Sequence, residues 1–174
     1  MVTQHGVRHP LLVLARGVIA AQARGETGAT PPPIGRSPPQ ACFVSLHAGS
    51  RLRGCIGTLR PSKQSLEEEV AANALAAATR DPRFAPLGLD ELPQIQVSID
   101  VLSQLEPAGS ERDLDPDQYG VVVRQGDRCG VLLPRLEGIR TPVQQIAICR
   151  KKAGIPADSE VTLERFTVLR LEEA

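Results

Sequence analysis

A strict alternation of apolar and polar residues near the middle of the chain restricts the possible folds most strongly. Ile95, Val97, Ile99 and Val101 alternate with Gln94, Gln96, Ser98 and Asp100. Because successive side chains of a strand point to opposite faces, this pattern predicts a strand with one face in a core and the other in water. The fold is therefore expected to contain a sheet with one buried face.

Three helices are predicted around this strand. Apolar residues recur at helical spacing over residues 11–24, and an Ala-rich helix over 65–79 begins with the spacing of a capping box. The second helix is expected to end before Asp81-Pro82, since the residue before a proline is pushed out of the helical region. Similar start and stop residues bracket a third helix over 141–154.

Hairpins and a closing strand complete the predicted order. One hairpin spans residues 42–58 and turns at Ala48-Gly49-Ser50, and another spans 121–133 and turns at Gly126. Residues 161–171 are predicted to form one closing strand. The order helix, hairpin, helix, strand, hairpin, helix, strand predicts an α+β fold with a mostly antiparallel sheet flanked by helices.

The chain is expected to form a single domain over residues 1–174. At this length a folded chain buries roughly 68–70% of the surface that its unfolded form exposes, so a core forms without disulfides or a metal. Residues 26–40 contain five prolines, which disfavour both helix and sheet. We predict that this segment is a surface connection packed on the domain rather than a linker between domains.

Composition argues against several classes of protein. The 20 basic and 20 acidic residues cancel, and the chain has three Phe, one Tyr and no Trp, which argues against binding of nucleic acid or of a membrane surface. Four dispersed cysteines lack metal-ligand spacing, so we expect no metal site and no cofactor. No signal peptide and no long apolar stretch is found, and we expect a cytoplasmic protein with reduced thiols.

Positive charge is concentrated in two parts of the sequence. Basic residues outnumber acidic ones over 1–61 and again over 119–152. If the arginines of the first hairpin fold near those of the second, they would line a cleft for a small anionic ligand. The alternative is a solvated surface that neighbouring acids neutralise.

The segment Leu52-Arg53-Gly54-Cys55-Ile56-Gly57-Thr58 is the strongest candidate for a site. Glycines weaken a strand and are tolerated where the backbone approaches something closely or bends at a bulge. A regular strand would place Arg51, Arg53 and Cys55 on one face, where the arginines would stabilise a Cys55 thiolate. The segment is therefore predicted to contact a ligand, another backbone or a sharp turn, with Cys55 either reactive or a small buried residue.

Other candidates come from the end of the Ala-rich helix. Asp81 could return to the segment and accept a proton or orient Arg53, or it could simply end the helix. Asn73 could bond the backbone of the segment or face water. His47 lies across the hairpin, but counting from the turn pairs it with Arg51 or Leu52 rather than with Cys55. The candidate catalytic residues are therefore Cys55, Arg53 and Asp81, and the candidate ligand-binding residues are Gly54, Gly57, Thr58, Asn73 and Arg83.

The segment 52–58 resembles the signature of the AMMECR domain family, also called AmmeMemoRadiSam system protein A. The resemblance covers nearly the whole chain, because further family features occur in the same order. They are Phe43-Val44-Ser45-Leu46-His47, the Asn73-bearing helix, Asp81-Pro82-Arg83-Phe84, the strand over 98–102, Gly130 to Pro134, and Lys152-Ala153-Gly154. The chain departs from the family at Arg135-Leu136, where members often have Gln and Val, and it lacks an aromatic residue before the final strand.

The resemblance implies a larger and a smaller lobe, with the signature lining a groove between them. It implies no established reaction. It also implies membership of a three-component system with a Memo-like protein and a radical S-adenosylmethionine protein. This chain lacks the C-x-x-x-C-x-x-C cluster motif, so radical chemistry would belong to a partner.

Three functions follow as hypotheses. The first is an enzyme or enzyme subunit with Cys55 as nucleophile and Arg53 as its electrostatic partner. The second is a non-catalytic module that recruits a partner protein or a small anionic ligand through the Gly54 to Gly57 backbone and nearby arginines. The third, nucleic-acid binding, rests on a G-x-x-G resemblance to KH domains, but that loop joins two helices and this one continues a strand.

Overall fold

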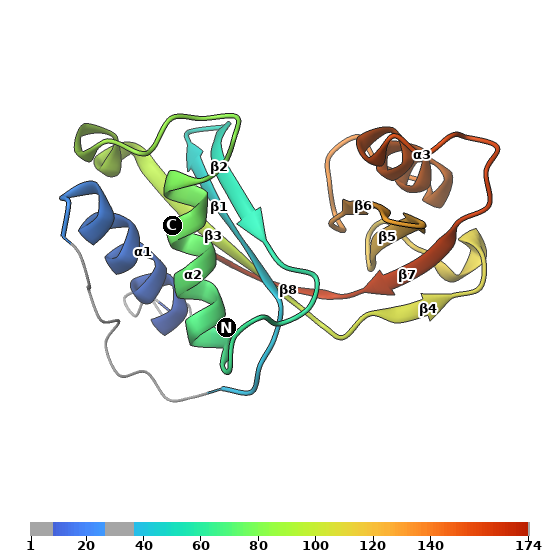
Figure 1. The fold of residues 1–174 in the computed structure, drawn as a ribbon, viewed down its shortest axis with the longest axis horizontal. Helices are drawn as coiled ribbons and strands as arrows, with labels where there is room; N and C mark the ends of the chain where they lie inside the picture. The colour runs from blue at the N-terminus through green and yellow to red at the C-terminus, as the bar shows by residue number, and fades with distance from the viewer. Residues whose placement is uncertain (1–8, 27–36, 174) are drawn as a thin grey trace, which may run out of the picture. The chain divides into compact units, whose positions relative to one another are not determined.

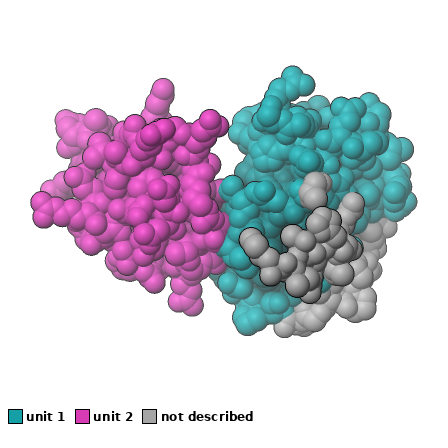
Figure 2. Space-filling model, turned by 180° about the vertical axis from the view of Figure 1, so that it is seen from behind, with its two compact units in different colours: residues 1–101, 169–174 teal, residues 102–168 magenta. Residues whose placement is uncertain are grey.

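The computed structural model describes residues 9–26 and 37–173, which divide into two compact units (Figures 1 and 2). Unit 1 comprises residues 1–101 and 169–174, and unit 2 comprises residues 102–168. Helices and antiparallel strands occur in both units, which confirms the α+β prediction. The described part of the chain contains no helix that is long and apolar enough to cross a membrane.

Unit 1 consists of a four-stranded sheet and two long helices (Figure 1). Its elements are α1 (Pro10–Ala23), β1 (Cys42–Ala48), β2 (Arg51–Gly57), α2 (Leu66–Thr79), the 3-10 helix η1 (Leu89–Gln94), β3 (Ile95–Leu102) and β8 (Val168–Glu172). The strands lie in the order β2-β1-β3-β8, and β1 pairs antiparallel with both β2 and β3. The strand β2, which carries most of the signature segment, is therefore an edge strand.

The alternation in β3 has the predicted effect. Ile95, Val97 and Ile99 are buried, whereas Gln96 is exposed. On β1, Val44 and Leu46 are fully buried in the same apolar cluster, which α1 and α2 complete. One face of the sheet thus packs on the helices. The opposite face, which carries Gln96 and Ser98, does not take part in this packing.

The hairpin of β1 and β2 contains a β-bulge. Gly49 takes a φ of 60° in the turn, and His47 pairs with Leu52, as the count from the turn predicts. The register then shifts between Leu46 and His47, because Leu46 pairs with Gly54 and leaves Arg53 as the extra residue. A shared face for Arg51, Arg53 and Cys55 was predicted for a regular strand, and the strand is not regular because the bulge interrupts the alternation.

Unit 2 contains a second four-stranded sheet and one long helix. Its elements are β4 (Glu106–Ala108), the 3-10 helix η2 (Glu111–Asp113), β5 (Gly120–Gln125), β6 (Arg128–Leu132), α3 (Pro142–Ala153) and β7 (Thr162–Phe166), with strand order β4-β7-β5-β6. A capping box at Thr141 begins α3, and Gly154 ends it with a φ of 65°. Val121 and Cys149 are fully buried in the core between this helix and the sheet.

The predicted closing strand over residues 161–171 is wrong in one respect. It is two strands, β7 and β8, which belong to different sheets and are separated by Thr167. The backbone N–H of Thr167 donates to the hydroxyl of Ser103, and its carbonyl accepts from the Ser103 N–H. Thr167 thus bonds to Ser103 between the two strands, and the segment predicted as one strand contributes to two different sheets.

Two expectations lie beyond what the described residues test. Most of the proline-rich segment 26–40 falls within residues 27–36, which lie outside the described part of the chain. The groove between two lobes concerns the arrangement of the two units and stays a prediction.

Candidate functional site

The two glycines of the signature segment are explained by packing within unit 1. A Cβ atom at Gly54 would overlap the carbonyl oxygen of Ala77 in α2. A Cβ atom at Gly57 would overlap the ring of Phe43 and lie 2.7 Å from the carbonyl oxygen of Cys42. The close approach that the sequence predicted is therefore an approach to the chain's own backbone and to an aromatic ring.

Cys55 lies on the sheet face opposite the helices. It pairs with Ser45, which in turn pairs with Ser98, so three small polar side chains form a row across β2, β1 and β3. The Ser45 hydroxyl donates a hydrogen bond to the Cys55 sulfur over 3.3 Å, and the Cys55 residue is only partly buried. We refer to Ser45, Cys55 and Ser98 as the polar row.

The surroundings of Cys55 favour the neutral thiol. Burial raises the pKa of the Cys55 thiol, and the carboxylates of Asp100 and Asp81 raise it further. The Ser45 hydrogen bond and the Arg83 charge act in the opposite direction but do not outweigh burial. Because the thiolate is the nucleophilic form, a raised pKa of Cys55 disfavours its reaction as a nucleophile.

Asp81 does return to the signature segment, where it binds the backbone. Its Oδ2 atom accepts from the Cys55 N–H over 2.9 Å and from Arg83 Nη2 over 2.7 Å, and its Oδ1 atom accepts from Arg83 Nε over 2.9 Å. The Arg83 hydrogen bond is the main cause that holds the Asp81 pKa well below its usual range. Asp81 is therefore a poor proton acceptor, and it orients Arg83 rather than Arg53.

Arg53 is not the electrostatic partner of Cys55. Its Nε and Nη2 atoms donate to Glu91 over 2.7 and 2.9 Å, and Nη2 also donates to the Ala85 carbonyl. The ring of Phe84 lies 5.6 Å from the guanidinium carbon of Arg53 and 5.4 Å from that of Arg83. The two arginines thus flank one aromatic ring beside β2, and a carboxylate fixes each of them.

Thr58 and Asn73 anchor the ends of the strands. Asn73 is buried and donates to the Cys42 carbonyl over 2.9 Å, so it contacts β1 rather than the signature backbone or water. The Thr58 N–H donates to the same carbonyl, and its hydroxyl donates to Glu69 over 2.6 Å. Both residues therefore have structural contacts already.

An ion pair lies on the same sheet face as the polar row, and the sequence did not reveal it. Asp100 pairs with Phe43 of β1, so it shares that strand face with Ser98. Its two carboxylate oxygens accept from Arg170 Nε over 2.7 Å and from Nη2 over 3.0 Å. Counting across the hairpin with one bulged residue is the only signal that could have found Ser45 opposite Cys55, whereas nothing in the sequence pairs Asp100 with Arg170.

The described contacts of Cys55 and Asp81 are with other residues of this chain. Among the described residues, only Ser45 makes a hydrogen bond to the Cys55 sulfur, and Asp81 is occupied by Arg83 and by a backbone N–H. No group of three or more His, Cys, Asp or Glu side chains in the described ranges is placed to hold a metal ion. An activated nucleophile needs an adjacent base or a lowered pKa. The pKa of Cys55 is raised, and within the described ranges its sulfur has a hydroxyl rather than a base as its hydrogen-bond partner.

Comparisons with known proteins agree on one family. The model of the AMMECR1 family matches residues 12–171. A protein of Thermotoga maritima is 51% identical over 130 residues, which cover 74% of this chain and 75% of that protein. A protein of Clostridium acetobutylicum is 46% identical over 132 residues, which cover 76% of this chain but only 28% of that much longer relative.

A solved structure has the same fold. The crystal structure of an uncharacterised protein from Pyrococcus horikoshii superimposes with a TM-score of 0.85 and 28% sequence identity. The match covers 94% of this chain and 89% of that one, so the fold similarity extends over both described units.

Proposed function

This chain belongs to the AMMECR1 family, and from that premise we propose that it is a non-catalytic binding module for a small anionic ligand. The ligand would bind beside the segment 52–58, with Arg83 as its cationic contact. The observation that carries the proposal is that one edge of the Arg83 guanidinium is bound to Asp81 while much of the side chain is exposed to solvent. The side chain is 55% exposed although the carboxylate that orients it is only 2% exposed.

The geometry around Arg83 supports recognition of an anion. Nε and Nη2 bind the buried Asp81, while Nη1 makes no hydrogen bond within the described ranges. A buried carboxylate that fixes one edge of a guanidinium holds the other edge in place for a second oxyanion, with little further loss of side-chain entropy. Contact with the Phe84 ring restrains the same group.

Cys55 would line this site as a neutral thiol. Its N–H is held by the same Asp81 that holds Arg83, so the strand edge and the cation are linked through one carboxylate. A neutral thiol next to a hydroxyl offers weak hydrogen bonds without adding negative charge, which is compatible with an anionic ligand. A Cys55 thiolate would instead repel such a ligand.

We propose further that the module works with a Memo-like protein and a radical S-adenosylmethionine protein. The support is the resemblance of the signature segment and of the order of elements to the system that carries these names. The chain itself has no C-x-x-x-C-x-x-C motif to hold an iron–sulfur cluster for radical chemistry. The contribution of this chain would then be recruitment of a ligand or partner, and the reaction would belong to another component.

The reactivity of Cys55 tests whether the module is catalytic. We expect Cys55 to alkylate about tenfold more slowly than the exposed Cys129 at pH 7.5, with an apparent pKa above the ordinary value of about 8.5. Iodoacetamide labelling followed by peptide mass spectrometry over pH 6–10 measures both thiols in one sample. Cys55→Ser assigns the signal, and an apparent pKa below 7 would refute the non-catalytic proposal in favour of a nucleophile.

Binding of inorganic phosphate and sulfate tests the role of Arg83. We expect Arg83→Gln to weaken phosphate binding by about tenfold, which corresponds to the loss of one charge-assisted contact. Arg80→Gln is the matched control, because Arg80 is a nearby exposed arginine at the end of α2. Titration followed by two-dimensional NMR would report the amides of β2, and equal binding by wild type and Arg83→Gln would exclude Arg83 as the contact.

A further inference from the structure

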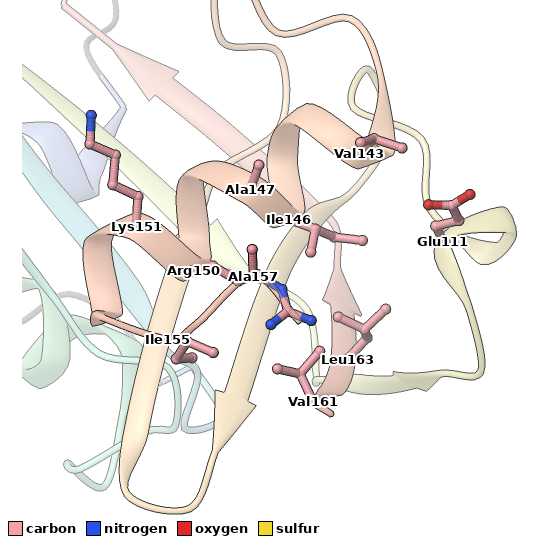
Figure 3. Close-up of a pocket in the computed structure, with 10 residues that line it drawn as sticks. All are labelled: Glu111, Val143, Ile146, Ala147, Arg150, Lys151, Ile155, Ala157, Val161 and Leu163. Atoms are coloured by element: carbon pink, nitrogen blue, oxygen red, sulfur yellow. The ribbon is translucent and has the colours of Figure 1, made fainter. Parts of the chain in front are cut away.

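Unit 2 contains a cavity that the proposed function does not use. It has a volume of about 550 Å³ and lies between α3 and the segment that leads into β7 (Figure 3). Most of its lining is aliphatic and comes from Val143, Ile146, Ala147, Ile155, Ala157, Val161 and Leu163. Its volume falls within the range of roughly 300–1,000 Å³ typical of small-molecule sites, which are also mostly apolar with a few polar groups.

One of those few polar groups is the guanidinium of Arg150. It lies between Ala157 and Val161 in the wall of the cavity (Figure 3). Its hydrogen bonds go to the carbonyls of Pro156 and Ser159 and to the Ser159 hydroxyl, which are all neutral acceptors. Within the described ranges Arg150 forms no ion pair, so only neutral acceptors bind this partly buried cation.

We propose that this cavity binds a small amphiphilic anion, namely an aliphatic chain that ends in a carboxylate. The aliphatic lining removes the chain from water, and the carboxylate is placed at Arg150, whose positive charge it neutralises. Lys151 adds a second positive charge at the rim, although its amine points away from the cavity (Figure 3). A chain with polar groups along its length would lose their hydrogen bonds to water without replacement by this lining.

Glu111 is the one acidic residue of the lining, and it could select a cationic head group in place of the anionic one that Arg150 would select. Its carboxylate lies across the cavity from Arg150, on the side of Val143 and Leu163 (Figure 3). If Glu111 rather than Arg150 selected the head group, the cavity would prefer an aliphatic amine. The charge of the head group that binds best therefore shows whether Arg150 or Glu111 selects the ligand.

A series of eight-carbon probes tests the proposal on the full chain. Octanoate, octanamide and octylammonium share the chain length and differ in charge, and hexanoate shortens the chain. We expect octanoate to bind at least fivefold more tightly than octanamide and octylammonium, and about fifteenfold more tightly than hexanoate, at about fourfold for each of the two methylenes. NMR titration should shift the amides of α3 and of the residues before β7. Equal binding of octanoate and octanamide, tighter binding of octylammonium, or no binding of octanoate would each overturn the proposal.

Two pairs of variants locate the site and the charge. Ala157→Trp fills the cavity and should abolish octanoate binding, whereas Val13→Trp places the same side chain on the exposed side of α1 in unit 1 and should leave it unchanged. Arg150→Lys should retain the preference for octanoate over octanamide, and Arg150→Gln should lose it. Thermal unfolding of Arg150→Gln checks that the loop over Pro156 and Ser159 remains folded. Octanoate binding that survives Ala157→Trp, or a preference that survives Arg150→Gln, would contradict the assignment.

Discussion

Gly54→Ala is expected to lower the free energy of unfolding by about 3 kcal/mol. The new Cβ atom would overlap the carbonyl oxygen of Ala77, which belongs to the backbone of α2 and not to a flexible side chain. Either β2 or α2 has to move, and both pack on the core that contains Val44 and Val70. Urea unfolding followed by circular dichroism measures the change.

Gly17→Ala is the matched control for this prediction. Gly17 lies within α1 with no atom within 4 Å of the position of its Cβ, so the methyl group enters open space. Replacing a helical glycine by alanine in that setting should raise the free energy of unfolding by about 0.5–1 kcal/mol. If Gly54→Ala proved as stable as wild type and instead lost phosphate binding, the glycine would serve a ligand and the packing explanation would be wrong.

Gly54 also shows what the sequence can and cannot reveal about a site. Two glycines beside a cysteine in a strand predicted a close approach, and the structure contains one at each glycine. The identity of the approaching group depends on how α2 lies on the sheet and on the rotamer of Phe43. Both are set by packing between segments distant in the sequence, which a local pattern does not encode.

Most elements of the fold could be predicted because their signals are local. The alternation in β3, the Ser65 side chain that accepts from the Glu68 N–H, and the left-handed Gly154 all depend on residues within one turn or one strand. The division at Thr167 could not be predicted in this way. Phe166 and Val168 both favour a strand, and the residue that interrupts them does so by bonding to Ser103, far away in the sequence.

The partners of the charged residues show the same limit. The sequence left open whether Asp81 returns to the signature segment or only ends the helix, and in the structure it binds the Cys55 N–H. Arg53 was expected beside Cys55, but its carboxylate partner is Glu91, 38 residues later. Arg53 is the extra residue of a bulge, which breaks the alternation expected of a regular strand, and sequence alone does not place a bulge.

Glu69→Ala is expected to lower the free energy of unfolding by about 3 kcal/mol, because a buried carboxylate holds the chain that follows the signature segment. Glu69 is 1% exposed and accepts from the N–H groups of Ser62 and Lys63 over 2.8 Å each, as well as from the Thr58 hydroxyl. Alanine would leave these donors without their acceptor. Chemical unfolding measures the loss, and hydrogen exchange at Ser62 and Lys63 should accelerate in the variant.

Glu69→Gln removes the charge of Glu69 but keeps the size of its side chain. The effect of this variant on the free energy of unfolding should therefore depend on pH. Burial alone would raise the pKa of Glu69, but the hydrogen bonds from Thr58, Ser62 and Lys63 outweigh it and lower the pKa below the ordinary value of about 4.3. A lowered pKa in the folded state means that the carboxylate stabilises the fold above about pH 4.3 and loses this effect as the pH falls through the folded pKa.

The glutamine can still accept both backbone N–H groups, and the hydroxyls can reverse to accept from its amide. Glu69→Gln should therefore be less destabilised than Glu69→Ala at pH 7, and its difference from wild type should shrink as the pH falls from 5 to 3. A difference that stayed constant over this range would show that the Glu69 charge does not contribute to stability.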